Sequence, residues 1–239
     1  MVQPDTIADR IAAVRERISV ACRRAGRRSE EVTLIGVSKT FPLQFVEEAA
    51  DAGLSDFGEN RVQEFVEKAR VALPRRLGGR LTWHMIGHLQ RNKAKDVIEY
   101  ADVFHALDSR RLAAELHKKA DTVERRLPCF VQVNVSGEAS KFGIEPDMLP
   151  AFLLDLAPYD RLDVVGLMTI AAPTENPETI RPQFARLRRL LETERDNVPP
   201  HINLSGLSMG MSGDFEVAIE EGATHVRIGS VIFGQRDQP

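Results

Sequence analysis

The chain has 239 residues, of which 43% are apolar and 28% are charged, and its formal net charge is −3. A chain of this size and composition can bury one large core or two small ones. Its arginine pairs are scattered among acidic residues, which is typical of solvated helix faces and argues against a nucleic-acid-binding surface. The chain has two cysteines, no signal-peptide pattern and no apolar run near the roughly 20 residues of a membrane span. These features predict a cytoplasmic protein without disulfides or membrane segments.

The first predicted element is an amphipathic helix over residues 5–26, because apolar residues recur at helical spacing from Ile7 to Cys22 and Gly26 ends the pattern. Short apolar segments then alternate with helical patterns. The segments typical of strands cover residues 32–37, 54–57, 81–86, 103–107, 129–135, 164–168, 202–204 and 225–228. The helical patterns cover residues 43–52, 61–73, 91–100, 109–124, 147–156, 179–194 and 213–221. The seventh strand is expected to begin at 202–204 and to lead into a loop rich in glycine, serine and methionine.

Eight strands, each followed by a helix or turn about every 25 residues, fit a (β/α)8 barrel better than an open doubly wound sheet. The dinucleotide-binding form of the open sheet would show a GxGxxG motif after its first strand, and this chain has none there. No linker or change in composition divides the sequence. We therefore predict one domain over residues 1–239, with an added N-terminal helix in residues 1–26 and the barrel in residues 32–239.

In such a barrel the functional residues lie at the carboxyl ends of the strands, and Lys39 follows the first predicted strand. A lysine at the end of a core strand packs poorly, because its ammonium is costly to bury. An amine in a dry pocket, however, has a lowered pKa and can form a Schiff base with an aldehyde. The alternative is a side chain whose ammonium extends to solvent along an apolar stem.

Two stretches rich in glycine and serine, residues 205–213 and 229–230, follow the seventh and eighth predicted strands. Many barrels hold a phosphate at this place, and glycine lets backbone N–H groups approach an anion closely. Ordinary tight turns are the alternative. Arg227 precedes the second stretch and would place a cation opposite a heteroaromatic nitrogen, whose protonation it would disfavour by like-charge repulsion. The alternative for Arg227 is a surface position.

A lysine for an aldehyde, a phosphate site and an arginine near a ring nitrogen together predict a pyridoxal phosphate (PLP) site. Lys141, after the fifth strand, is the second candidate amine and could contact phosphate or react transiently. Lys39 is preferred because it follows its strand directly and can be held rigidly. His84 and His88 have HxxxH spacing, but positions four apart in a strand are separated by about 13 Å. Without a third ligand, no metal site is predicted.

Seven motifs run in order from the first strand to the C-terminus: GVSKT at 36–40, GENRVQE at 58–64, WHMIGHLQRNK at 83–93, NVSGEASKFG at 134–143, GLMTI at 166–170, LSMGMSGDFEVAI at 207–219 and VRIGSVIFGQR at 226–236. With these motifs the chain closely resembles the pyridoxal phosphate homeostasis protein family, which is related to the N-terminal barrel of alanine racemase. The departures are small: His88 and Arg91 stand at variable positions, and Ser230 stands where many members have threonine.

The resemblance implies a PLP site with assigned residues. Lys39 would form the covalent aldimine, and Arg227 would lie near the pyridine nitrogen. The phosphate would lie near Ser208, Gly229 and Ser230, and the pocket would be lined by Asn60 and Met168. The resemblance also implies a cofactor-binding, regulatory protein of vitamin B6 homeostasis without established catalysis.

The tyrosines give an independent reason to predict binding rather than catalysis. Racemisation generally needs acid and base groups on both faces of the α-carbon, and the racemase resemblance supplies one as a tyrosine of a second domain. Here the tyrosines are Tyr100 and Tyr159, and neither lies in a candidate site loop. We expect a monomeric barrel that binds and buffers PLP, with PLP-dependent enzymes as candidate acceptors. A weak amino-acid racemase and a phosphate-binding barrel enzyme of central metabolism are the alternatives.

Overall fold

The computed structural model describes residues 6–72, 81–138, 141–172, 174 and 176–234. Within these residues, eight parallel strands close into a barrel in chain order. The strands are β1 (Thr33–Val37), β2 (Asp56–Glu59), β3 (Thr82–Met85), β4 (Val103–Leu107), β5 (Leu127–Gln132), β6 (Leu162–Met168), β7 (Gly206–Met211) and β8 (His225–Ile228). The barrel closes where β8 pairs with β1, with Ile35 opposite Arg227. Closure leaves no strand edge unpaired.

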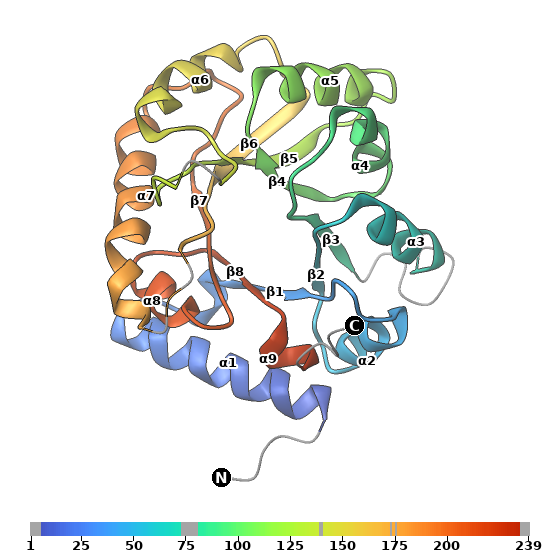
Figure 1. The fold of residues 1–239 in the computed structure, drawn as a ribbon, viewed down its shortest axis with the longest axis vertical. Coiled ribbons are helices and arrows are strands. Elements are labelled where there is room, and N and C mark those ends of the chain that lie inside the picture. The colour runs from blue at the N-terminus through green and yellow to red at the C-terminus, as the bar shows by residue number, and fades with distance from the viewer. Residues whose placement is uncertain (1–5, 73–80, 139–140, 173, 175, 235–239) are drawn as a thin grey trace.

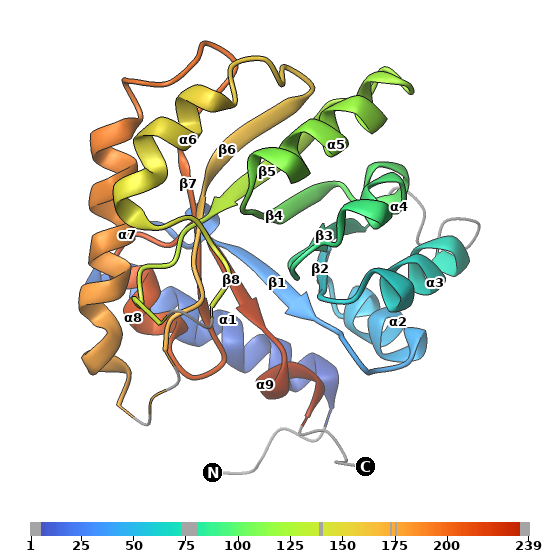
Figure 2. The same cartoon turned by 45° about the horizontal axis from the view of Figure 1, so that its top comes forward.

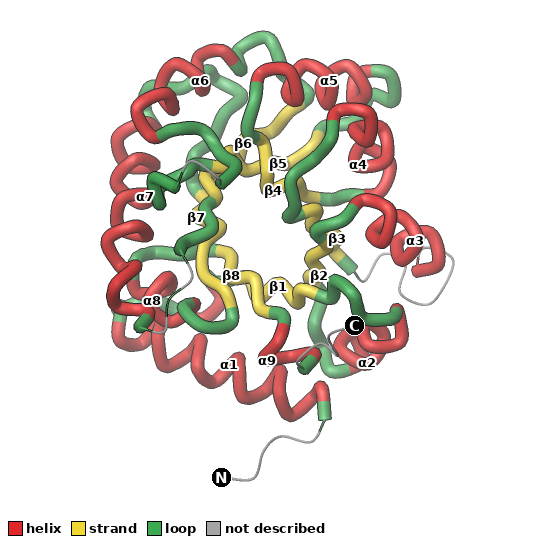
Figure 3. Tube along the Cα trace, viewed as in Figure 1, coloured by secondary structure: helices red, strands yellow, loops and turns green. Residues whose placement is uncertain are grey.

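The helices form a layer outside the strands, so that the barrel is a ring of strands within a ring of helices (Figure 1, Figure 3). They are α1 (Ile7–Arg24), α2 (Leu43–Asp51), α3 (Val62–Ala72), α4 (Ala94–Tyr100), α5 (Arg110–Asp121), α6 (Leu149–Asp155), α7 (Arg181–Glu194), α8 (Phe215–Glu220) and α9 (Ser230–Phe233). Each core-facing helix buries one apolar stripe against the strands. The predicted (β/α)8 fold with an added N-terminal helix is confirmed. Among the described residues, no helix is both long enough and apolar enough to cross a membrane.

The N-terminal helix α1 packs against the outside of the barrel, beside α8, α9 and α2 (Figure 2). It begins at a capping box, in which Thr6 Oγ1 accepts a hydrogen bond from the backbone N–H of Asp9 at 3.1 Å. Its buried stripe includes Ile11 and Val14. The expected start of this helix at residue 5, and the expected end of the next-but-one helix at residue 73, lie outside the described residues.

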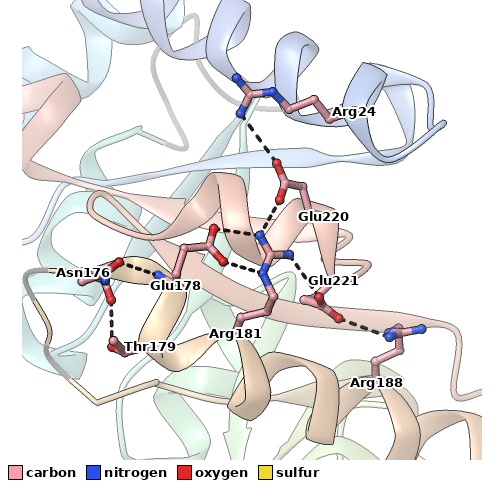
Figure 4. A network of polar contacts seen from close by, with 8 residues as sticks. All are labelled: Arg24, Asn176, Glu178, Thr179, Arg181, Arg188, Glu220 and Glu221. Carbon is pink, nitrogen blue, oxygen red and sulfur yellow. Dashed lines mark hydrogen bonds and ion pairs between the residues drawn. The ribbon is translucent and has the colours of Figure 1, made fainter.

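A network of ion pairs joins α1, α7 and α8 on the outer surface (Figure 4). Arg181, the first residue of α7, contacts Glu220 at 2.6 Å and Glu221 at 3.1 Å. It also pairs with Glu178 at 2.7 Å in the turn before α7. Hydrogen bonds to Glu178 and then to Glu220 raise the pKa of Arg181. Because Arg24 at the end of α1 contacts the other oxygen of Glu220 at 3.7 Å, one carboxylate links the first helix to the seventh.

The prediction for the seventh strand is wrong. Residues 202–204 precede the strand, and β7 is formed by Gly206–Met211, the segment expected to be a loop. Glycine and serine have low strand propensity, but pairing with β6 and β8 overrides it. A Cβ on Gly166 of β6 would lie only 2.0 Å from the backbone oxygen of Gly206, so β6 and β7 approach each other more closely than side chains would allow. The short helix α9, which begins at Ser230, was not predicted.

Candidate functional site

Lys39 lies two residues beyond the end of β1 and is half-buried. A Cβ on Gly36 would point out of the barrel, because it would lie 3.4 Å from the ring of Phe233 in α9. The neighbouring Ile35 points into the barrel, where a Cβ on Gly58 would lie 3.0 Å from its side chain. Because side chains alternate along an extended strand, odd-numbered positions of β1 face the barrel interior, and Lys39 has the same parity. Lys39 is therefore at the carboxyl end of an interior-facing row, where barrels of this type carry their functional residues.

A buried ion pair holds the residue before Lys39. Lys68 of α3 donates to the backbone oxygen of Ser38 at 2.8 Å and to Glu59 Oε1 at 2.7 Å. The hydroxyl of Ser38 donates to the same oxygen of Glu59 at 2.7 Å. Burial raises the pKa of Glu59, although the charge of Lys68 opposes this. The other carboxylate oxygen, Glu59 Oε2, is buried and has no hydrogen-bond partner among the described residues.

The residue after Lys39 is held by the same cluster. The backbone N–H of Thr40 donates to Glu64 Oε1 at 2.5 Å, and Lys68 donates to that oxygen at 2.7 Å. Thr40 has a φ of +69°, a left-handed conformation that a β-branched residue rarely adopts. The turn that carries Lys39 is thus fixed on both sides through Lys68, and the strained backbone of Thr40 is held by its hydrogen bond to Glu64.

Gly229 and Ser230 lie at the end of β8, next to the end of β1. A Cβ on Gly229 would be 3.2 Å from the backbone oxygen of Val37, so the two strand ends are in close contact. The backbone N–H of Gly229 donates to Ser212 Oγ at 3.2 Å, which brings the end of β7 to the same place. Ser230 is exposed at the start of α9. Two hydroxyl groups and a glycine backbone are therefore gathered beside the strand that leads to Lys39.

Ser208 lies inside the barrel rather than in a loop at its mouth. It is fully buried in β7, and its hydroxyl contacts Arg227 Nη1 at 2.6 Å and His105 Nδ1 at 2.8 Å. These contacts engage the hydroxyl that the sequence assigns to a phosphate. Ser212, which is in the predicted stretch and directly follows β7, has the hydroxyl that lies beside Gly229.

Arg227 is a buried cation of β8 that contacts the middle of β7 and the residue after β6. It is 4% exposed, and it donates to Ser208 Oγ at 2.6 Å and to the backbone oxygen of Thr169 at 2.7 Å. In the described part of the chain it forms no ion pair with a carboxylate. Burial lowers the pKa of Arg227 to about 10, with the charge of Asp214 opposing the shift, so the group remains a cation at neutral pH.

The remaining predicted residues are distributed around the barrel mouth. Met168 ends β6 and is fully buried, opposite Ser208 in the sheet. Asn60 follows β2 and is half-buried; a Cβ on Gly87 would lie 2.1 Å from its backbone oxygen, so only glycine allows this approach. Lys141 lies in the loop after β5, where its ammonium is 3.0 Å from Glu138 Oε1 of the same loop.

Sequence reasoning missed two polar residues inside the barrel, Asp56 and His105, and the contacts of a third, His84. His84 Nδ1 lies 2.9 Å from His105 Nε2, and His84 Nε2 lies 3.0 Å from Asp56 Oδ1. His88, the expected second half of the HxxxH pair, instead contacts Asp108 at 2.9 Å and stacks on Phe142. Over the described ranges, no group of three or more histidine, cysteine or acidic side chains could hold a metal ion. The available signal was a histidine in the middle of an otherwise apolar strand, as in residues 103–107.

The sequence matches one family along almost its whole length. The family model described as alanine racemase, N-terminal domain, matches residues 10–237. The pyridoxal phosphate homeostasis protein of Aquifex aeolicus (strain VF5) is 44% identical over 231 residues, which are 95% of this chain and 97% of that protein. The protein of the same name from Escherichia coli (strain K12) is 42% identical over 231 residues, 97% of each. The chain belongs to the pyridoxal phosphate homeostasis protein family.

A solved structure has the same fold with the cofactor present. PipY of Synechococcus elongatus PCC7942, with PLP bound, is 35% identical to this chain and has a TM-score of 0.84, covering 96% of this chain and 100% of that one. The resemblance that the motifs indicate is therefore confirmed. In this member of the pyridoxal phosphate homeostasis protein family, Lys39, Met168, Arg227, Gly229 and Ser230 lie at the carboxyl ends of three strands.

Proposed function

We propose that this protein binds PLP and takes part in vitamin B6 homeostasis, with Lys39 holding the cofactor as a Schiff base. The observation that carries this proposal is the contact between the ends of β1 and β8, which puts Gly229 beside Val37, two residues before Lys39. The names of the relatives and the PLP-bound PipY structure support the choice of cofactor.

The groups available at this end of the barrel fit the chemistry of PLP. A phosphate needs N–H and hydroxyl donors, and Gly229, Ser230 and Ser212 supply them close together. An aldehyde needs an amine that can lose its proton, which Lys39 supplies at a half-buried position. When bound, PLP would supply an electrophilic aldehyde and an aromatic ring that accepts electrons when its nitrogen is protonated.

Arg227 would keep that ring a weak electron acceptor. Its guanidinium is buried and remains cationic, so it disfavours a second positive charge on a nearby ring nitrogen. The clamp on Ser38 and Thr40 would keep the backbone of Lys39 in place while the amine reacts. These residues together favour retention of the cofactor over its use in turnover.

We infer a binding and regulatory role rather than an enzymatic one, with PLP-dependent enzymes as acceptors. Tyr100 accepts a hydrogen bond from Arg70 at 2.8 Å on the outer helices, and Tyr159 packs against His117. Neither tyrosine is among the groups gathered around Lys39. The match to the alanine racemase family keeps a weak racemase as the alternative. Monomeric state and cytoplasmic location remain predictions.

The decisive experiment is the visible absorption spectrum of the purified protein with PLP, before and after borohydride reduction, followed by peptide mass mapping. We expect a band that reduction bleaches and a pyridoxyl group on Lys39. Lys39→Ala should remove the band, and Lys141→Ala is the matched control that should retain it. Absence of a band in the wild type, or a pyridoxyl group on Lys141 alone, would overturn the assignment. Cofactor-dependent racemisation of alanine that Lys39→Ala abolishes would favour the racemase.

A further inference from the structure

A continuous hydrogen-bonded chain crosses the inside of the barrel. From Arg227 Nη1 it passes to Ser208 Oγ at 2.6 Å and from there to His105 Nδ1 at 2.8 Å. It continues from His105 Nε2 to His84 Nδ1 at 2.9 Å and ends with His84 Nε2 at 3.0 Å from Asp56 Oδ1. The five residues come from five different strands, β8, β7, β4, β3 and β2.

The two ends of this hydrogen-bonded chain differ in their surroundings. Arg227 is next to the last residue of β8, on the side of Lys39, whereas Asp56 is the first residue of β2. Asp56 is the partly exposed member, with 21% of its side chain accessible. It lines a cleft of about 650 Å³ between α1 and the beginnings of β1 and β2, together with Arg15, Glu16 and Glu30. The hydrogen-bonded chain therefore runs from Arg227, near the proposed cofactor site, to a solvent-accessible carboxylate at the start of β2.

Counting donors assigns a direction to every hydrogen bond. A guanidinium can only donate and an ionised carboxylate can only accept, so both ends are fixed. Three bonds lie beyond Ser208 Oγ, and three protons are available for them when both rings are neutral: one each on Ser208, His105 and His84. Ser208 then donates to His105 Nδ1, His105 Nε2–H to His84, and His84 Nε2–H to Asp56. In the other neutral tautomer of His105, the proton is on Nδ1, so His84 would have to donate from its own Nδ1. His84 Nε2 would then carry no proton and would face the carboxylate of Asp56 as a second acceptor.

The surroundings support a neutral His105 and an ionised Asp56. Burial lowers the pKa of His105 well below its ordinary value, and the positive charge of Arg227 adds to this. The ring stacks on Phe130 at 4.5 Å. Burial alone would raise the pKa of Asp56, but hydrogen bonds from His84 and Ser55 outweigh it and the pKa lies below the ordinary value. A neutral His105 between the Arg227 cation and the Asp56 carboxylate agrees with the assigned hydrogen-bond directions.

We propose that Asp56, His84, His105 and Ser208 are positioning residues for Arg227, because their one-directional hydrogen bonds hold its guanidinium at the proposed cofactor site. Barrel interiors are usually filled by branched apolar side chains, so a polar chain here is stable only when every member is satisfied. With its proton committed to His105, the Ser208 hydroxyl presents lone pairs to Arg227 and fixes its orientation. The effect of Arg227 on the pyridine ring of PLP rests on the proposed function, whereas the series of hydrogen bonds from Arg227 to Asp56 does not.

The first test measures the histidine tautomers by ¹⁵N NMR in the protein without cofactor, so its outcome does not depend on PLP binding. We expect His105 and His84 to carry their protons on Nε2 at neutral pH. Protonation of His105 on Nδ1 would overturn the assigned direction. If the tautomers are as expected but PLP does not bind, the proposed function is wrong, and the assigned hydrogen-bond directions remain supported.

The second test follows the absorbance of the PLP-loaded protein against pH. When its guanidinium is held less firmly, Arg227 repels a proton on the pyridine nitrogen less. We therefore expect Ser208→Ala and the distant His84→Leu to shift the midpoint of the absorbance titration to higher pH. The expected shift is about half a pH unit, or roughly threefold in proton affinity. Ser208→Thr, which retains the hydroxyl, should restore the wild-type midpoint. Ile86→Val is the control, because it alters the packing beside Gly58 and leaves the five hydrogen-bonded residues unchanged. An unchanged midpoint in both Ser208→Ala and His84→Leu would overturn the proposal.

Discussion

Lys68 Nζ lies 2.7 Å from Glu59 Oε1, and the two side chains are only 7% and 0% exposed. This ion pair sits directly behind the turn of Lys39, because Lys68 also donates to the backbone oxygen of Ser38. A buried pair of this kind adds little net stability, since desolvation offsets much of the attraction. Its value here is geometric: it fixes a turn whose next residue has a left-handed backbone.

Although the intact ion pair adds little net stability, removal of Lys68 alone should destabilise the fold strongly, because it leaves a buried charge without a partner. Lys68→Met leaves Glu59 buried without a charge partner, and one of its oxygens is already without a hydrogen bond. The expected loss is about 3–5 kcal/mol in the free energy of unfolding, measured by urea denaturation. The double variant Lys68→Met, Glu59→Gln should recover part of it, because the amide carries no charge. Lys95→Met at an exposed position of α4 should change stability by less than about 0.5 kcal/mol.

Ser212 should contribute more than Ser208 to phosphate binding. Ser212→Ala removes the hydroxyl beside the N–H of Gly229, and a hydrogen bond to a charged group is worth about 1.5 kcal/mol or more. We expect the Kd for PLP to rise about tenfold without a change in the wavelength of the band. Ser19→Ala, on α1, is the matched control. Wild-type affinity in Ser212→Ala, combined with loss of binding in Ser208→Ala, would restore Ser208 as the phosphate ligand.

Stability should fall with acid because of His225. Burial lowers its pKa from 6.5 to about 4. Between these values the unfolded state binds more protons than the folded state, so stability rises with pH and is lost as pH falls from 6.5 toward 4. This histidine alone accounts for up to about 3 kcal/mol over that range. His225→Asn cannot titrate there and should flatten the profile of unfolding free energy against pH; an equally steep profile would contradict the assignment.

Two glycines should differ strongly in their response to the same substitution. Gly166→Ala puts a methyl group 2.0 Å from the backbone of Gly206, so β6 and β7 must separate. Backbone displacement in the core should cost more than about 3 kcal/mol, measured as a fall in Tm. Gly213→Ala meets nothing within 4 Å and should leave Tm within a few degrees of the wild type. A Gly166→Ala protein as stable as Gly213→Ala would show that the strands can adjust.

The order of strands and helices was predictable because it depends on local periodicity. Apolar segments such as residues 103–107 match their strand to the residue, and the position of Lys39 after β1 follows from the same pattern. The segment Gly206–Met211 was not predictable in this way. Its glycines weaken any strand signal, and it becomes a strand because neighbouring strands supply its hydrogen bonds.

By itself the sequence determined the barrel fold, the family and the strand ends that carry Lys39, Arg227 and Gly229, because each is written in short contiguous motifs. Only the tertiary structure decided that Ser208 faces the interior, that Lys68 supports the turn of Lys39, and that Asp56 connects to Arg227. Such contacts join residues far apart in the chain, 103 positions in the case of His105 and Ser208. They form only when the barrel closes, since closure alone brings the inward faces of separate strands within hydrogen-bonding distance.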